Sequence, residues 1–129
     1  MKVKQIKETC MYVHDLVQAL DFYHGLLGLP VISHVKGKHI FFRAGNSVLL
    51  CFNPESSKNK KSPPPHYAEG KYHFAFEVAR EDYEHEKQSL LSKGIQITDE
   101  VVWKDGLRSC YFEDPAGNVL EIVPEGVWD

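Results

Sequence analysis

Two short segments of this chain alternate apolar and polar residues with the period of a β-strand, and they look like two copies of one unit. The first covers residues 6–13, with Thr9, Met11 and Val13 on one face. The second covers residues 72–78, and 65 positions (73 − 8) separate Glu8 of the first from His73 of the second. Similar stretches follow each segment, so the pattern predicts an internal duplication.

The first copy continues with a helix and three further strands. Asp15 is a suitable N-cap, and Gly28 followed by Pro30 ends the helical pattern. The apolar positions with helical spacing are Leu16, Ala19, Leu20, Tyr23, Leu26 and Leu27. Strands are then expected at residues 31–36, 38–44 and 47–52. The order of elements is therefore β-α-β-β-β.

The second copy repeats this order. A helix is expected near residues 81–93, with Gly94 as its C-cap, and strands are expected near 95–103, 108–113 and 118–123. We therefore predict the α+β fold class, with one domain of residues 1–129. It is made of two tandem βαβββ modules at residues 5–52 and 72–124.

The connection between the modules, residues 53–71, has few apolar residues and three consecutive prolines. Such a composition has too little to bury and predicts a surface linker. A lid over a binding site is the alternative role, and His66 is the residue of the connection that would then reach a cavity.

Composition restricts the classes of partner and the compartment. A net charge of −3 gives no broad basic field, which argues against nucleic acid as a partner. No run approaches the roughly 20 apolar residues of a membrane helix, and the charged first ten residues do not resemble a secretory signal. The three cysteines lie in strand-like segments, which favours buried free thiols in a reducing cytoplasm.

Three residues with metal-binding side chains occupy strand positions related by the repeat, namely Glu8, His73 and Glu121. Each taken alone has a simpler interpretation, a solvent-facing glutamate or a packed histidine, but their coincidence at equivalent positions favours one shared site. One imidazole and two carboxylates suit one divalent metal ion such as Mn²⁺, Ni²⁺, Fe²⁺, Mg²⁺ or Zn²⁺. Three protein ligands would leave open positions for water or a substrate oxygen.

Polar residues next to Glu121 are candidates for substrate binding. Ser109 and Tyr111 alternate onto one face of a neighbouring strand and could donate hydrogen bonds, although simple packing is the alternative for the tyrosine. Arg108 at the start of that strand could bind an anion. The remaining histidines are interpreted as surface residues: His14, His24, His34, His39 and His85.

The two ends of the repeat resemble the vicinal oxygen chelate superfamily, which includes glyoxalase I, bleomycin-resistance proteins, extradiol dioxygenases and fosfomycin-resistance thiol transferases. The opening motif is ETCMYVHDL at residues 8–16, continued by ALDFY and LGL at 19–23 and 27–29. The closing motif is YFEDPAGNVLE at residues 111–121. The resemblance covers about residues 5 to 124. It implies a curved mixed sheet that forms a cup, helices on its outer face, and a homodimer with a divalent metal in each cup.

The resemblance also implies four metal positions, one on the first and one on the last strand of each module. These are Glu8, Leu50, His73 and Glu121. Leucine cannot bind a metal, so the set resembles the three-ligand members of the superfamily. In the chemistry that the members share, a metal-bound carboxylate, here Glu8 or Glu121, serves as the catalytic general base.

Three functions remain open. The first is a metal-dependent lyase or isomerase of the glyoxalase type, which chelates a small oxygenated substrate and stabilises an enolate or oxyanion. The second is a thiol transferase similar to fosfomycin-resistance proteins, favoured by the three-ligand set. The third is a metal-free protein that sequesters a small molecule such as a drug. An extradiol dioxygenase fits less well, because its iron site has two histidines and this set has one.

Overall fold

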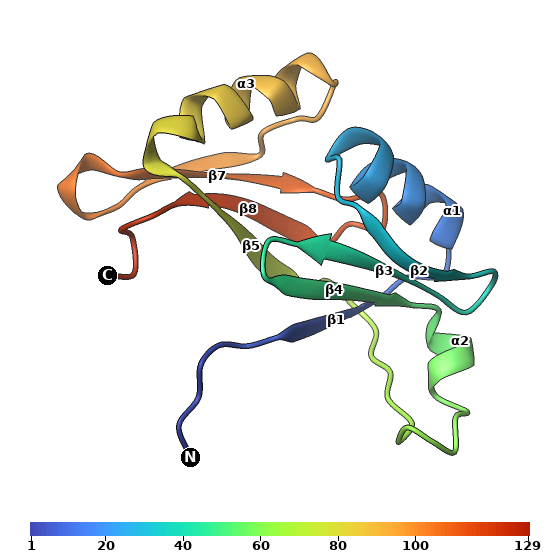
Figure 1. Ribbon diagram of the computed structural model, residues 1–129. Coiled ribbons are helices and arrows are strands. Elements are labelled where there is room, and N and C mark those ends of the chain that lie inside the picture. Colours follow the sequence, from blue (N-terminus) through green and yellow to red (C-terminus); the bar gives the residue numbers. More distant parts are fainter. The chain divides into compact units, whose positions relative to one another are not determined.

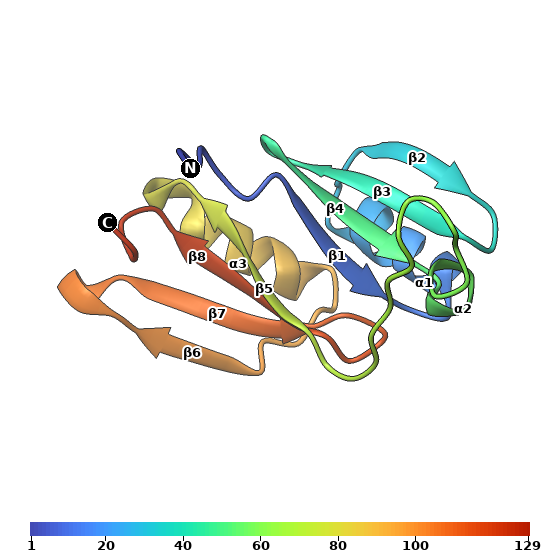
Figure 2. The same ribbon diagram turned by 90° about the horizontal axis from the view of Figure 1, so that it is seen from below.

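The computed structural model describes all residues, 1–129, and divides into two compact units, residues 1–70 and 71–129. Each contains one four-stranded mixed sheet, as Figures 1 and 2 show. No helix combines the length and the apolar character needed to cross a membrane.

The first unit follows the predicted β-α-β-β-β order. Its strands, in sheet order, are β1 (Glu8–Tyr12), β4 (Ser47–Phe52), β3 (His39–Ala44) and β2 (Val31–Val35). The β1–β4 pair is parallel and the other pairs are antiparallel. On the side of β1 that sequence analysis predicted to be apolar, Met11 and Val13 are buried.

The helix of the first unit differs from the expected regular α-helix. It begins as α1 (Leu16–Ala19), capped by the Asp15 carboxylate, which accepts a hydrogen bond from the Gln18 amide. It then widens into the π-helix η1 (Leu20–Leu26), in which the Leu27 amide bonds the Phe22 carbonyl at 2.9 Å. The wider turn changes the period, and the consecutive Phe22 and Tyr23 are both buried.

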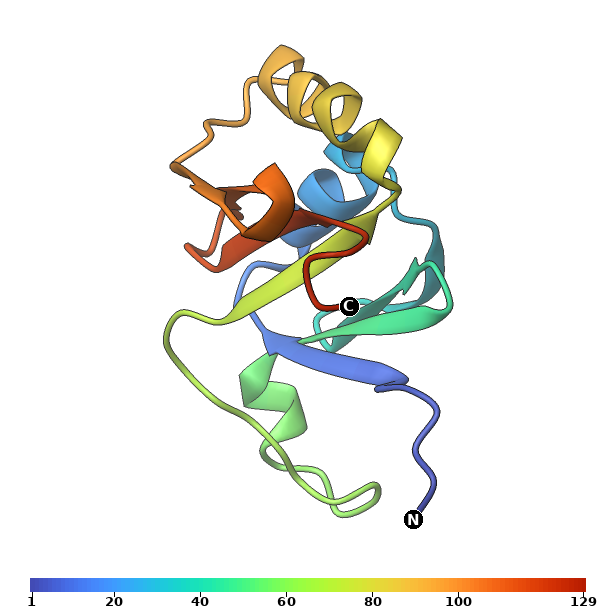
Figure 3. The same cartoon turned by 90° about the vertical axis from the view of Figure 1, so that its left-hand side faces the viewer.

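The second unit repeats the topology with the sheet order β5 (His73–Val78), β8 (Val119–Pro124), β7 (Arg108–Glu113) and β6 (Asp99–Val102). Its helix α3 (Tyr83–Ser92), preceded by the 3₁₀ turn η2 (Arg80–Asp82), confirms the helix expected near residues 81–93. Figures 1 and 3 show α3 over one face of this sheet. A second 3₁₀ turn, η3 (Lys104–Gly106), joins β6 to β7.

Two expectations are wrong in detail. The strand expected at residues 95–103 begins only at Asp99, because the preceding residues end α3: the Ile95 and Gly94 amides donate to the Leu90 and Leu91 carbonyls. The 53–71 connection also carries a short helix, α2 (Pro54–Ser57), whose Glu55 amide donates to the Asn53 side chain. The Asn-Pro-Glu sequence holds that signal, since asparagine caps helices and proline suits their first turn.

The strand register supports the alignment of the two copies. Within the first unit Glu8 pairs with Val48 and Cys10 with Leu50. Within the second unit His73 pairs with Val119 and Ala75 with Glu121. The two parallel pairs therefore have the same register, and Leu50 of the first unit stands in the position that Glu121 has in the second.

Candidate metal site

His73 and Glu121 lie on adjacent parallel strands of the second unit, and their side chains meet. His73 Nε2 is 3.4 Å from Glu121 Oε2. The two side chains differ in exposure, since that of His73 is 51% exposed and that of Glu121 only 8%. Buried carboxylates are rarely found without a partner, so the contact with His73 is significant for Glu121.

The backbone determines which nitrogen of His73 faces the carboxylate. Nδ1 of His73 lies 3.0 Å from the carbonyl oxygen of Val119. A carbonyl only accepts, so Nδ1 must carry the hydrogen and donate it. In a neutral ring Nε2 then has a free lone pair directed at Glu121 Oε2. Two lone-pair donors at this distance repel each other, and a cation or a proton between them removes the repulsion.

Tyr111 is the third side chain of this group. It pairs with Glu121 across the antiparallel β7–β8 ladder, and its ring stacks on that of His73 with centroids 5.9 Å apart. Burial raises the pKa of the Tyr111 phenol, a hydrogen bond from Ser109 lowers it, and the hydrogen bond to Glu121 and its negative charge raise it. The phenol therefore stays protonated near neutral pH.

Ser109 lies on the same face of β7 as Tyr111, as expected, but it is fully buried. Its hydroxyl oxygen accepts a hydrogen bond from Trp103 Nε1 at 2.8 Å. Trp103 was not among the residues predicted from the sequence. The Asp-Gly turn at residues 105–106 held the signal, because it folds the residues before the turn back onto those after it.

Arg108 lies on the opposite face of β7, because side chains alternate along a strand. Its guanidinium donates to Glu100 at 3.2 Å, and Glu100 also binds Lys87 of α3. The structure thus brings Ser109 and Tyr111 to the face of Glu121 and leaves Arg108 on the helix side.

Glu8 belongs to the first unit, where it is exposed on β1 and shares a face with Cys10 and Tyr12. Cys10 is exposed, so the expectation of three buried thiols is wrong for it and holds for Cys51 and Cys110. Partial burial raises the pKa of the Cys10 thiol, and the charge of Glu8 raises it further. No group of three or more His, Cys, Asp or Glu side chains gathers within either unit.

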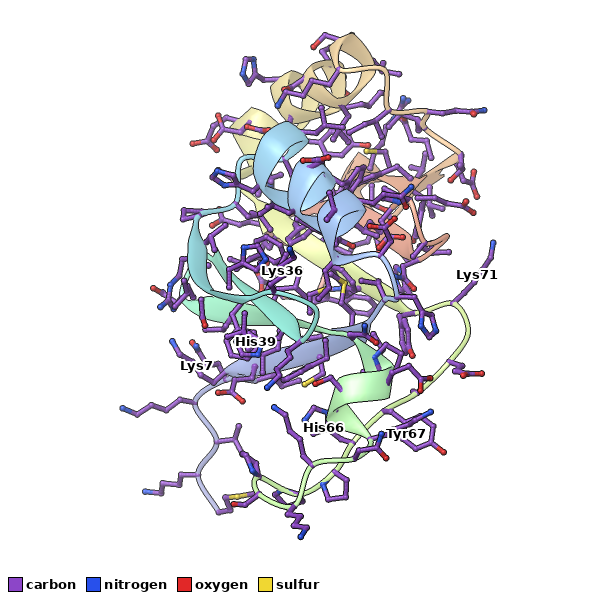
Figure 4. The ribbon with its side chains drawn as sticks, turned by 90° about the vertical axis from the view of Figure 1, so that its right-hand side faces the viewer. Lys7, Lys36, His39, His66, Tyr67 and Lys71 are labelled. Atoms are coloured by element: carbon purple, nitrogen blue, oxygen red, sulfur yellow. The ribbon has the colours of Figure 1, made fainter.

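An aromatic cluster on the first sheet was also not predicted from the sequence. The ring of His39 stacks on Phe41 with centroids 4.1 Å apart, and Phe52 contacts both. From the 53–71 connection His66 joins the cluster: its Nδ1 lies 2.7 Å from the Tyr12 hydroxyl, and its ring packs on Phe52. Figure 4 marks His39 and His66 on their separate elements. Both residues are half-buried, so His39 is not the surface residue that was expected.

The duplicated βαβββ topology is a feature of a glyoxalase-like protein. The model of the Glyoxalase/Bleomycin resistance protein/Dioxygenase superfamily matches residues 5–122. The chain therefore belongs to this superfamily, and the resemblance seen in its sequence motifs is confirmed.

Similar proteins include named enzymes. The chain is 29% identical to the glutathione transferase FosA of Serratia marcescens over 93% of its own length and 80% of the relative's. It is 26% identical to the metallothiol transferase FosB of Bacillus licheniformis, over 99% and 80% of the two lengths. Among solved structures, lactoylglutathione lyase from Agrobacterium tumefaciens is 31% identical, with a TM-score of 0.92 and 98% of each chain covered.

Proposed function

We propose that this protein is a divalent-metal-dependent enzyme that acts on a small oxygenated substrate, with a reaction of the lyase or isomerase type. The observation that carries the proposal is the contact between His73 Nε2 and Glu121 Oε2 at 3.4 Å. Because Nδ1 is engaged by the Val119 carbonyl, the pair offers a nitrogen lone pair and a carboxylate to the same point. That donor set fits a divalent ion of the first transition series or magnesium.

A bound divalent ion supplies Lewis-acid stabilisation of negative charge that develops on a substrate oxygen. His73 and Glu121 would hold it, and Glu8, at the equivalent position of the first module, is the predicted third ligand. Glu8 and Glu121 are also the two candidates for the general base. Glu121 is held by its neighbours, whereas exposed Glu8 is free to turn toward a substrate proton, which favours Glu8 as the base.

The test begins with metal analysis of protein purified without a histidine tag. We expect about one divalent ion per chain in the wild type and a strong loss in His73→Ala and Glu121→Gln. The matched control is Glu113→Gln, which removes the same charge from an exposed glutamate of β7. Wild-type metal content in both site variants would contradict the proposal. A protein without metal that still binds small molecules would support the sequestering alternative instead.

A second candidate reaction is thiol transfer. It is supported by the two relatives named as a glutathione transferase and a metallothiol transferase, and by Leu50 at the position of a fourth ligand. Turnover of a hemithioacetal formed from a 2-oxoaldehyde and glutathione would favour the isomerase. Consumption of a thiol together with an epoxide would favour the transferase.

We also propose that the small-molecule substrate is turned over by a homodimer, as is usual for small two-module chains of the superfamily. Light scattering after size-exclusion chromatography tests this, with twice the chain mass of 14.8 kDa as the expected result.

A further inference from the structure

We infer that Trp103 and Trp128 form an apolar wall beside the His73–Glu121 pair, and that the substrate carries an aromatic group that packs on this tryptophan wall. The two indoles contact each other, with ring centroids 5.9 Å apart. The inference rests on the proposed function, which brings the substrate oxygens to His73 and Glu121. It adds the chemical class of the group attached to those oxygens.

Trp103 lies on the face of the second sheet that presents Glu121. Its indole N–H donates to the Ser109 hydroxyl at 2.8 Å. Ser109 shares a face of β7 with Tyr111, which pairs with Glu121 across the β7–β8 ladder. Ser109 itself is 0% exposed, so a bound molecule would touch the indole that Ser109 anchors and not the serine hydroxyl.

Trp128 lies in an anchored segment although its own side chain is 81% exposed. Before it, the Glu125 amide donates to the Val78 carbonyl at 2.9 Å. After it, the Asp129 carbonyl accepts a hydrogen bond from the Lys104 side chain. Figure 1 shows this segment on the side of the second sheet that faces away from α3. The segment therefore holds the indole where a ligand can meet it.

The exposed surface of the tryptophan wall is suited to an aromatic group. Tryptophan is mostly buried in folded chains, and clustered apolar side chains at the surface mark binding sites. The two rings are inclined at 49°, and aromatic groups gain stacking or edge-to-face attraction on such surfaces in addition to burial. Ser109, the anchor of the wall, lies about 7 Å along β7 from Tyr111, the neighbour of Glu121. A phenyl ring joined directly to two chelating oxygens has a comparable length.

The first experiment compares two 2-hydroxy acids, mandelate and lactate, which chelate a metal through the same oxygens and differ in a phenyl or a methyl group. Calorimetric titration of Mn²⁺-loaded wild type should give an affinity for mandelate at least about 10-fold above that for lactate. In Trp128→Ala this ratio should fall toward one, because tryptophans at binding sites contribute factors of this size. An unchanged ratio overturns the inference, and so does metal-loaded wild type that binds neither acid.

The matched control is Tyr67→Ala, which removes another exposed aromatic side chain, 60% accessible on the 53–71 connection. This variant should keep the wild-type ratio of the two affinities. Because Trp128 is as exposed as Tyr67, neither substitution removes a core contact, and circular dichroism should show both variants folded.

A second measurement needs neither metal nor turnover. Both tryptophans of the chain belong to the wall, so tryptophan emission originates there alone. Anilinonaphthalene sulfonate bound to metal-free wild type should be excited by energy transfer from them, and Trp128→Ala should weaken its binding at least about 10-fold. If the wild type holds no metal, the proposed function fails while this titration still tests the wall. Dye affinity that is unchanged in Trp128→Ala overturns the inference. A change from dimer to monomer in this variant also overturns it, because a second copy of the chain would then cover the indole.

Discussion

Glu121→Gln should separate the folding role of this residue from its metal-binding role. In metal-free protein the substitution removes a buried charge but keeps the shape of the side chain and one oxygen that can accept a hydrogen bond. A hydrogen bond to a charged group contributes about 1.5–3 kcal/mol and a neutral one about 1 kcal/mol. The relief of desolvation offsets that difference. We therefore expect the free energy of unfolding without metal to change by no more than about 1 kcal/mol.

With metal the two proteins should differ strongly. An ion present at 100 times its dissociation constant stabilises the wild type by about 2.7 kcal/mol, which for a chain of this size raises Tm by about 10 °C. Loss of a direct ligand should weaken binding at least 100-fold, the upper end of what indirect partners cause. At the same metal concentration the variant would then gain only about 0.4 kcal/mol, or about 2 °C.

The assay is thermal unfolding followed by circular dichroism, with and without Mn²⁺, for the wild type, Glu121→Gln and Glu113→Gln. Glu113 is a suitable control because it is an exposed partner of Lys71 at 3.3 Å, and such surface pairs contribute about 0–1 kcal/mol. The control should keep the full metal-dependent rise in Tm. An equal rise in Glu121→Gln would refute the assignment of Glu121 as a ligand.

Three further predictions concern the other residues. Glu8→Gln should reduce turnover by at least about 100-fold if Glu8 is the general base, and unchanged kcat at equal metal content would reject that role. Tyr12→Phe removes the hydrogen bond to His66 and should speed limited proteolysis of the 53–71 connection by about fivefold; Tyr67→Phe serves as the control, and equal cleavage rates would contradict the bond's role. Burial and nearby positive charges lower the pKa of His39, so the stability it confers is complete above about pH 6.5 and falls as the pH drops. His39→Phe should flatten the stability profile between about pH 7 and pH 5 in urea titrations, and an unaltered profile would argue against this origin.

The fold could be predicted in large part from the sequence because the alternation typical of strands and the spacing typical of helices are both strong. Strand alternation around Met11 and the Gly-Asn turns at 45–46 and 117–118 predicted the duplicated topology, and the glycines in those turns do adopt positive φ. The π-helical segment could not be predicted, since its sequence also satisfies the ordinary helical period. The late start of β6 depends on the hydrogen bond that the Ile95 amide donates to the Leu90 carbonyl at the end of α3. The sequence does not show whether this amide bonds the helix end or a neighbouring strand.

The site was predictable only at the level of strand positions. Repeat alignment brought His73 and Glu121 to adjacent strands, but the tautomer of His73 depends on the Val119 carbonyl, a backbone atom with no sequence signature. The hydrogen bond from Trp103 to Ser109 could not be predicted, because the position of Trp103 follows from how the β6–β7 hairpin turns. Arg108, in contrast, could have been placed from the sequence. Side chains alternate along β7, so Arg108 faces the opposite side of the sheet from Ser109 and Tyr111.

The two copies share a register yet differ in the chemistry they present at equivalent positions. The second offers His73 and Glu121 on neighbouring strands; His73 is held by a backbone carbonyl, and the side chain of Glu121 is buried. The first offers exposed Glu8 and, at the position of Glu121, the apolar Leu50. Preorganised ligands lose little freedom when they bind, whereas a mobile carboxylate must be ordered but can also move a proton. This asymmetry supports the proposal that His73 and Glu121 would hold a metal ion and that Glu8 would be the general base.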